Sequence, residues 1–328
     1  MAISLQNGNK NIALLAPMQS GKTGSIKQLC NIILPEINYL KSNESVMFLT
    51  SIRDKDLYEQ NLRALENDFS NIIVIKVDEF RKRGMIEVER NNVKLIIRDE
   101  DQYGCGTEST FDRGFFENVR KLNNTIPLIS VSATPYDVID ANNKGYELDV
   151  ISGIRSKNYF GITEMLSDKL IINIDSNYQH FIVSEDKYKF LSNEIKDCLL
   201  HLNKFKNGLG IIRTSKTSEA VELKNQIKSN NNAFDTVVIG CSKECDFGIK
   251  EGLRTLPRLI KNQNKKVVVI VINALTAGKD LKSLKNFVRF VIETRKRQLA
   301  NCAQGLPGRV CGYHSNRDIK IYANESIL

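Results

Sequence analysis

The chain has 328 residues, 41% hydrophobic and 26% charged, a composition typical of soluble globular proteins and not of disordered or fibrous ones. No apolar run reaches the length of a transmembrane helix, and the first residues lack the apolar core of a signal peptide, so we expect a cytoplasmic protein. Seven cysteines and three histidines are scattered without metal-ligand spacing, which argues against a disulfide framework and a structural metal site; the formal net charge of +9 favours a polyanionic partner.

In the first half of the chain, apolar runs alternate with amphipathic, helix-compatible stretches. Most of the runs are continuously apolar, as expected for strands of a parallel sheet that is covered on both faces. Strands are expected over residues 11–17, 46–52, 71–77, 93–100 and 127–134, with helices between them, for example over 54–69 and 111–123. The pattern predicts an α/β lobe over residues 1–145.

The alternation stops near residue 140 and resumes near residue 187. Residues 146–186 fit neither pattern, and we expect an extended connector there. A helix is expected over 187–205, and strands follow over 208–215, 236–241, 266–273, 288–294 and 319–323. The predicted fold is therefore α/β with two lobes, 1–145 and 187–328, each a mostly parallel sheet with helices on both faces.

A phosphate-binding loop is indicated directly after the first expected strand. Residues 16–23 read Ala-Pro-Met-Gln-Ser-Gly-Lys-Thr and precede a helix-compatible stretch, which is the context of a P-loop. Gly21 allows the backbone N–H groups to face the phosphates, Lys22 places a cation on them, and Thr23 offers a hydroxyl to Mg²⁺. ATP and Mg²⁺ are the expected cofactors, with the nucleotide bound by Ala16, Gln19, Ser20, Gly21, Lys22 and Thr23.

An acidic segment ends the fourth expected strand. Asp99-Glu100-Asp101-Gln102 follows an apolar run, and the carboxyl ends of parallel strands are where open α/β sheets bind ligands. Asp99 is expected to hold Mg²⁺, and Glu100 to orient and deprotonate the attacking water. Acidic runs are also common in solvated turns, but a P-loop needs an acidic partner, and this is the only expected strand that ends in adjacent acids of this kind.

These motifs resemble those of superfamily 2 helicases and translocases. In that family the P-loop begins with Ala, as at Ala16, and a Ser-Ala-Thr motif like that at 132–134 ends the strand after the acidic one. The resemblance implies two RecA-like lobes that hydrolyse ATP in the cleft between them while moving on nucleic acid. The residues implied to couple hydrolysis to movement are Asp101, Gln102, Ser132, Thr134 and Gln304.

The second half carries three further matches. Residues 211–215 resemble the family's fourth motif, 276–281 its fifth, and 304–309 its sixth. The resemblance implies that Gly278 and Asp280 reach the nucleotide and that Arg309 is an arginine finger, so the expected catalytic residues are Lys22, Glu100 and Arg309. Nucleic-acid contacts are implied for Thr50, Ser51, Thr214, Ser215 and Thr276.

The match departs from the family pattern in two places. The sixth motif has one extra residue before its Gly-Arg pair, and Gly312 stands where a second arginine is common. Upstream of the P-loop, Gln6 is the candidate for a glutamine that reads adenine. The overall pattern is nearer to type III restriction translocase subunits and compact phage-type helicases than to RNA DEAD-box proteins. DNA is therefore favoured over RNA as the partner, and a protein that recruits the motor is a further expected partner.

Two other functions stay open. A terminase-type packaging ATPase would also have a P-loop, but its nuclease-like second domain would carry clustered carboxylates. Asp235, Asp246, Asp280 and Asp318 are scattered along the second half, which disfavours that reading. The other alternative is a nucleotide-gated nucleic-acid-binding factor with weak hydrolysis.

Overall fold

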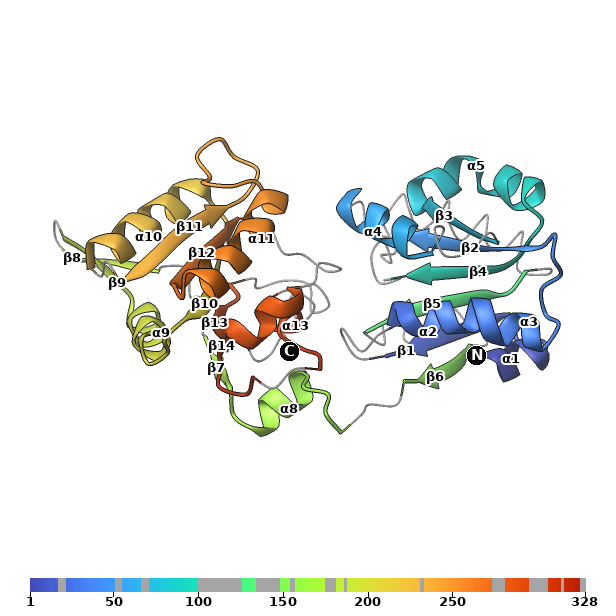
Figure 1. Cartoon of the computed structure of the whole chain (residues 1–328), viewed down its shortest axis with the longest axis horizontal. Helices are drawn as coiled ribbons and strands as arrows, with labels where there is room; N and C mark the ends of the chain where they lie inside the picture. The colour runs from blue at the N-terminus through green and yellow to red at the C-terminus, as the bar shows by residue number, and fades with distance from the viewer. Residues whose placement is uncertain are drawn as a thin grey trace. The chain divides into compact units, whose positions relative to one another are not determined.

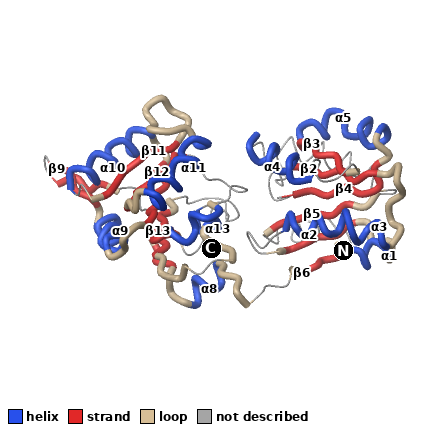
Figure 2. The backbone as a smooth tube through the Cα atoms, viewed as in Figure 1, coloured by secondary structure: helices blue, strands red, loops and turns tan. Residues whose placement is uncertain are grey.

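The computed structural model describes residues 1–16, 22–50, 55–65, 71–99, 126–133, 148–153, 157–174, 181–185, 188–230, 233–272, 281–294, 306–313 and 316–324. The chain divides into two compact units, Met1–Ser156 and Lys157–Leu328. Each unit contains a sheet with helices packed against it (Figure 1), and Figure 2 shows the helices and strands by colour. None of the described helices is long and apolar enough to cross a membrane.

The first unit is built on a six-stranded sheet with the order β3-β2-β4-β5-β1-β6, and its strands pair in parallel throughout. The carboxyl ends of these strands therefore lie at one edge of the sheet. The strands are β1 (Asn11–Leu15), β2 (Ser45–Thr50), β3 (Ile72–Lys76), β4 (Val93–Asp99), β5 (Leu128–Ser132) and β6 (Asp149–Ser152).

Alternate residues of these strands form two separate cores. Val46 and Phe48 of β2 join a cluster with residues of α2 (Lys22–Gln28), η1 (Leu29–Ile33), α3 (Leu34–Glu36) and α4 (Lys55–Leu65). Met47 and Leu49 join a cluster with residues of α5 (Val77–Arg90). Because successive side chains of a strand point to opposite faces, a strand covered on both faces is apolar at nearly every position. The short helix α1 (Ala2–Gln6) adds Leu5 to the first cluster.

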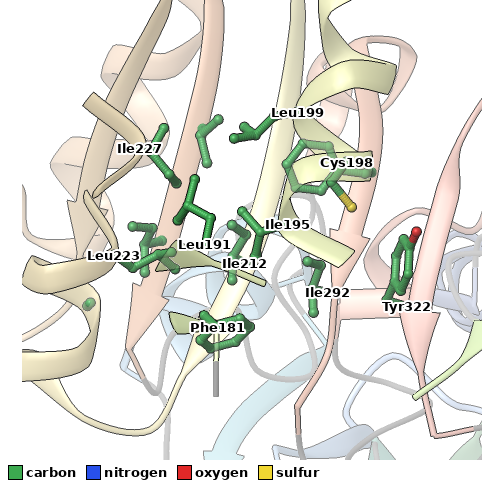
Figure 3. Packing of buried hydrophobic residues seen from close by; sticks show 14 of the residues in the cluster. Phe181, Leu191, Ile195, Cys198, Leu199, Ile212, Leu223, Ile227, Ile292 and Tyr322 are labelled. Carbon is green, nitrogen blue, oxygen red and sulfur yellow. The ribbon is translucent and has the colours of Figure 1, made fainter. Parts of the chain in front are cut away.

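The second unit repeats this plan with the order β11-β12-β10-β13-β14-β7, again with parallel pairs. Figure 3 shows Ile195 and Cys198 of α9 and Leu223 of α10 packed in one cluster with Ile212 and Ile292 of the sheet. Its strands are β7 (Ile171–Asn173), β10 (Gly208–Thr214), β11 (Phe234–Ile239), β12 (Lys266–Ile272), β13 (Val288–Ile292) and β14 (Lys320–Ala323). Its helices are α8 (Ile162–Ser167), α9 (Asn193–Asn203), α10 (Thr217–Asn230), α11 (Ile249–Pro257), η2 (Arg258–Asn262), η3 (Lys282–Phe287) and α13 (Leu306–Arg309). The predicted fold, α/β with two lobes of mostly parallel sheet, is confirmed.

The stretch 146–186 differs from the extended connector that the sequence predicts. It supplies β6 to the edge of the first sheet and β7 to the edge of the second, with α8 between them, and the division between the units lies inside it. Both strands are short, and every residue in them is partly or fully exposed. They therefore lack the continuous apolar run that marks a buried strand.

The helix expected over 187–205 begins later than predicted, at Asn193. The residues before it form β9 (Tyr188–Leu191), which pairs antiparallel with β8 (Ile182–Glu185). Ser192 then caps the helix, since its hydroxyl accepts the N–H of Ile195 at 3.4 Å. In the first unit, the helix expected over 54–69 is seen as α4, and the one expected over 111–123 lies outside the described residues.

Candidate nucleotide-binding site

Three predicted motifs of the first unit meet at the carboxyl-terminal edge of its sheet. β4, β5 and β1 are neighbours, and the register pairs Asp99 with Val131 and Ser132 with Leu15. The N–H of Ala16 donates to the carbonyl oxygen of Ser132 at 3.0 Å. The first residue of the expected P-loop, the aspartate predicted to bind metal and the serine of the Ser-Ala-Thr motif therefore lie on adjacent strand ends.

Lys22 and Thr23 open the helix that follows the P-loop. The helical backbone runs from Lys22 through η1 to the end of α3, and Ile26 and Leu29 anchor it in the core beneath the sheet. Lys22 and Thr23 themselves are partly exposed. Gln19, Ser20 and Gly21, which the sequence places on the phosphates, lie outside the described residues.

Asp99 is partly exposed at the end of β4 and, with Thr23, offers oxygen ligands. Mg²⁺ prefers such hard oxygens and is commonly held by one or two protein groups plus water and phosphate. The oxygen donors of the two residues are of the kind that Mg²⁺ takes in proteins. Among the described residues, no group of three or more His, Cys, Asp or Glu could hold a metal ion unaided. The remaining first-lobe predictions, Glu100, Asp101, Gln102 and Thr134, lie outside the described residues.

Gly153, which the sequence did not single out, lies against the start of the P-loop. It follows β6, and its N–H donates to the carbonyl oxygen of Leu15 at 2.6 Å. A β-carbon on Gly153 would stand 2.9 Å from the Cβ and 3.2 Å from the Cα of Ala16. Glycine is therefore what allows β6 to approach the P-loop so closely.

Arg98 is a second residue that the sequence analysis passed over. It precedes Asp99, is only 2% exposed, and lies between Leu49 and Ser130 in the register of the sheet. A cation so deeply buried is costly unless polar groups surround it, so a charged side chain is built into the strand that presents Asp99. The sequence does not distinguish Arg98 from Lys94, the other cation of the same strand, which is exposed.

Gln6, the candidate for reading adenine, does not lie at the P-loop edge. It is an exposed residue at the end of α1, which precedes β1 and lies at the amino-terminal end of that strand (Figure 1). Asn9, three residues later, hydrogen-bonds to Asp149 at the start of β6, 3.0 Å away. Since Ala16 is at the opposite end of β1, the structure separates Gln6 from the expected nucleotide site.

The residues predicted to contact nucleic acid divide into buried and exposed ones. Thr50 is 2% exposed, and its hydroxyl accepts from the Nδ2 of Asn61 at 3.4 Å. Thr214 is 1% exposed, and its hydroxyl donates to the carbonyl oxygen of Lys216 at 3.5 Å. Ser215 is exposed. Of the five, Ser51 and Thr276 lie outside the described residues, and Ser215 alone of the other three presents an exposed side chain.

In the second unit, Arg309 ends α13 and is 4% exposed. Gly278, Asp280 and Gln304 lie outside the described residues. Gly312, at the place of the family's second arginine, has φ of 127°, a conformation that side-chain-bearing residues rarely adopt. It exchanges two backbone hydrogen bonds with Phe160, of 3.0 and 2.8 Å. The departure from the family pattern therefore has a backbone reason.

A buried ion pair lies beside α13. The Nε of Arg213, in β10, is 2.9 and 3.0 Å from the two carboxylate oxygens of Glu293, which follows β13. Both side chains are almost fully buried, at 4% and 1% exposure. Glu293 also accepts the N–H of Leu306, the first residue of α13, at 3.1 Å. This cluster is invisible in the sequence because its members are far apart along the chain.

The protein has two parallel six-stranded sheets. In the first sheet, the start of the expected P-loop lies beside one strand that ends in an aspartate and another that ends in a serine. This architecture is that of a two-lobe RecA-like α/β protein. The fold is similar to that of solved helicases. One is S. cerevisiae Dbp5 bound to RNA and ADP BeF3, with a TM-score of 0.51, 16% identity, and 98% of this chain and 80% of that chain covered. Another is the Mycobacterium smegmatis helicase Lhr bound to ssDNA and AMP-PNP, with a TM-score of 0.52, 15% identity, and 98% of this chain and 44% of that chain covered.

At these identities the likeness establishes the fold. Comparison with protein-family models gives no match, and comparison with curated protein sequences gives none either.

Proposed function

We propose that the protein is an ATP-dependent nucleic-acid motor of the superfamily 2 kind. The observation that carries the proposal is the meeting of Ala16, Asp99 and Ser132 on adjacent strand ends. A nucleotide-hydrolysing site requires phosphate binding, metal binding and a coupling group at one place, and these three residues begin the corresponding motifs.

In the proposed first-lobe site, the P-loop and Lys22 bind the phosphates, while Thr23 and Asp99 hold Mg²⁺. Lys22 and Thr23 are partly exposed at the start of a helix whose apolar side is buried, which supports a fixed and accessible position for both. Mg²⁺, when bound, supplies charge neutralisation for the transferring phosphoryl group. Glu100, next to Asp99 in the chain, is proposed to orient and deprotonate the attacking water.

Arg309 is proposed as the arginine finger of the second lobe. Its guanidinium would stabilise the charge that develops on the γ-phosphate during transfer. With 4% exposure in this structure, the side chain must become accessible when the nucleotide is bound. Gly278 and Asp280 are proposed to complete the nucleotide contacts of this lobe, and Gln304 the coupling between hydrolysis and movement.

The proposed partner is nucleic acid, held through its phosphates. The structure of Dbp5 contains RNA and that of Lhr contains ssDNA, and the net charge of +9 suits a polyanion. Since Thr50 and Thr214 are buried, we expect their contacts to run through backbone groups near the strand ends, with Ser215 contributing an exposed hydroxyl. Such contacts position a strand without reading its bases.

The test is the rate of ATP hydrolysis by the full chain, titrated with single-stranded and duplex DNA and RNA in separate series. Lys22→Ala is the negative control, because it removes the cation proposed to bind phosphate, and Lys22 is partly exposed. We expect hydrolysis that depends on Lys22 and rises with at least one nucleic acid, with DNA the stronger stimulator. Hydrolysis that no nucleic acid stimulates would support the weakly hydrolysing binding factor instead, and no Lys22-dependent hydrolysis at all would remove the proposal.

A further inference from the structure

We propose that Glu293 is a positioning residue for Arg309, acting through the hydrogen bond that its carboxylate makes to the start of α13. The inference rests on the proposed role of Arg309 in ATP hydrolysis. It deepens that role because it names the group that fixes the position of the helix carrying Arg309.

The carboxylate of Glu293 is held in place from the sheet. Ile212 of β10 and Ile292 of β13 are paired in the register, so the residues that follow them, Arg213 and Glu293, are neighbours. The Nε of Arg213 contacts both carboxylate oxygens, and the N–H of Glu293 donates to the carbonyl oxygen of Tyr322 at 2.8 Å. Backbone and side chain of Glu293 are thus both tied to the sheet.

The same carboxylate then binds α13. One oxygen accepts the N–H of Leu306 at 3.1 Å, and Leu306 is fully buried. The first N–H groups of a helix lack partners within it, so an acceptor fixed to the sheet determines where this short helix begins. Leu306 and Arg309 are three residues apart and so lie on the same side of the helical turn. A displacement of Leu306 therefore moves Arg309 with it.

The other end of the segment is held by backbone groups. The main-chain groups of Gly312 and Phe160 exchange hydrogen bonds of 3.0 and 2.8 Å. Within the segment, the thiol of Cys311 also donates to the carbonyl oxygen of Pro307 at 3.5 Å. Residues 306–312 are thus anchored by main-chain bonds on the carboxyl-terminal side of Arg309 and by Glu293 on its amino-terminal side. Glu293 ties the segment to the sheet through a side chain, which a substitution can change, whereas the bonds to Phe160 are made by main-chain atoms.

The alternative is that the Arg213–Glu293 pair merely stabilises the sheet. A buried ion pair is a poor device for that purpose, because the cost of desolvating both charges offsets most of their attraction, and apolar pairs of similar size often do as well. What an apolar pair cannot provide is an acceptor for the N–H of Leu306. The two explanations therefore differ in whether the acceptor or the charge pair matters.

Two double variants separate them. R213M/E293Q removes both charges and keeps an amide oxygen that can accept from Leu306; R213M/E293L removes both charges and the acceptor. Both variants remove the two paired charges together, and equal melting temperatures would show that they fold alike. We expect R213M/E293Q to hydrolyse ATP within about threefold of the parent, and R213M/E293L to lose about tenfold or more in kcat with nucleotide affinity unchanged, as for a misplaced catalytic group.

Two further measurements tie the effect to its cause. The amide hydrogen of Leu306 should exchange with solvent at least about tenfold faster in R213M/E293L than in R213M/E293Q, since only the latter keeps the acceptor. In an R309A background, adding R213M/E293L should lower kcat by no more than about twofold beyond R309A with R213M/E293Q, because residues that act as a unit are non-additive.

The inference is overturned if the two double variants hydrolyse ATP equally, if Leu306 exchanges equally in both, or if the loss in R213M/E293L persists in full without Arg309. Parent-like hydrolysis by R309A would overturn both the finger and the role of Glu293. A parent protein with no more hydrolysis than Lys22→Ala would instead overturn the proposed function, and the exchange of Leu306 would still report on the hydrogen bond itself.

Discussion

Gly153 and Ala16 lie so close together that a β-carbon on Gly153 would stand 2.9 Å from that of Ala16, with the backbone of Ala16 at 3.2 Å. Because Ala16 begins the P-loop, we expect Gly153→Ala to displace the loop and weaken nucleotide binding. Overpacking of this kind costs about 1–3 kcal/mol. Titration with a fluorescent ATP analogue measures the loss of affinity.

Gly248→Ala is the control for that substitution. Gly248 precedes α11 with φ of −62°, and a β-carbon there would meet no atom within 4 Å. The control should bind nucleotide as the parent does. Equal affinity of Gly153→Ala and Gly248→Ala would show that the contact with Ala16 does not govern the P-loop.

Substitutions of Lys22 and of Glu100 should impair different steps, nucleotide binding for Lys22 and hydrolysis for Glu100. Lys22→Ala removes a charge that meets the phosphates in the bound ground state, so tight nucleotide binding should be lost. Glu100→Gln keeps binding and removes the base that acts on water only during the reaction, so hydrolysis should fall by about 10²–10⁴-fold. Binding and single-turnover hydrolysis measured side by side distinguish the two, and normal turnover by Glu100→Gln would show that the acidic motif is misassigned.

Gly312→Arg would restore the arginine that the family resemblance implies, but it should destabilise the protein. The residue has φ of 127°, and both its N–H and its carbonyl oxygen are hydrogen-bonded to Phe160. An arginine there would have to adopt a backbone conformation that is rare for residues with a side chain. Such strain costs about 1–3 kcal/mol. We expect a lower melting temperature than the parent in calorimetry and no gain in ATP hydrolysis. A variant as stable as the parent, or a faster one, contradicts the structural reading of this glycine.

The strands were predictable because their burial on both faces leaves a continuous apolar run. Val46, Met47, Phe48 and Leu49 illustrate this, since alternate members enter two different cores. The edge strands β6 and β7 have no such run, so the sequence predicted a connector there. The contact of Gly153 with Ala16 could therefore not be predicted.

The places of Ala16, Asp99 and Ser132 at strand ends were predictable because each follows or ends an apolar run, and their roles stay predictions. The site was not predictable where the outcome depends on distant partners. Nothing near Thr50 in the sequence indicates that Asn61 binds its hydroxyl. Likewise, Glu293 meets Arg213 across 80 residues of chain, and only the sheet register brings them together.

His201 should make the stability of the protein depend on pH. It is 7% exposed on α9, with its Nε2 3.5 Å from an oxygen of Asp318. Burial lowers the pKa of its imidazole from the usual 6.5, against the opposing attraction of Asp318. Because the folded pKa lies below the unfolded one, the stabilisation is complete above about pH 6.5 and is lost as pH falls through the folded value.

We therefore expect the melting temperature to drop between about pH 7.5 and 5.5 by more in the parent than in His201→Gln. The comparison cancels the titration of the other two histidines, which both proteins share. Parallel pH profiles for the two proteins would mean that His201 keeps its ordinary pKa in the folded state.

Nucleic-acid binding should weaken steeply with salt and show little base preference. The net charge of +9 and the lack of tryptophan leave phosphate contacts as the main expected source of affinity. On single strands, the logarithm of the binding constant should fall with the logarithm of salt concentration by about 0.7 per phosphate contacted. Anisotropy titrations with oligonucleotides of different sequence test this, and sequence-selective binding that ignores salt would contradict it.

The place of β6 at the sheet edge has a mechanical meaning. This strand is held by β1 along four register pairs, and the next bond along the chain joins Gly153 to Leu15, the residue before Ala16. Tension on the chain that leaves the first unit would therefore act first on the bond between Gly153 and Leu15, and then on the pairing of β6 with β1. In this lobe, the residue that accepts the bond from Gly153 and the residue that begins the proposed phosphate-binding loop are consecutive in the chain.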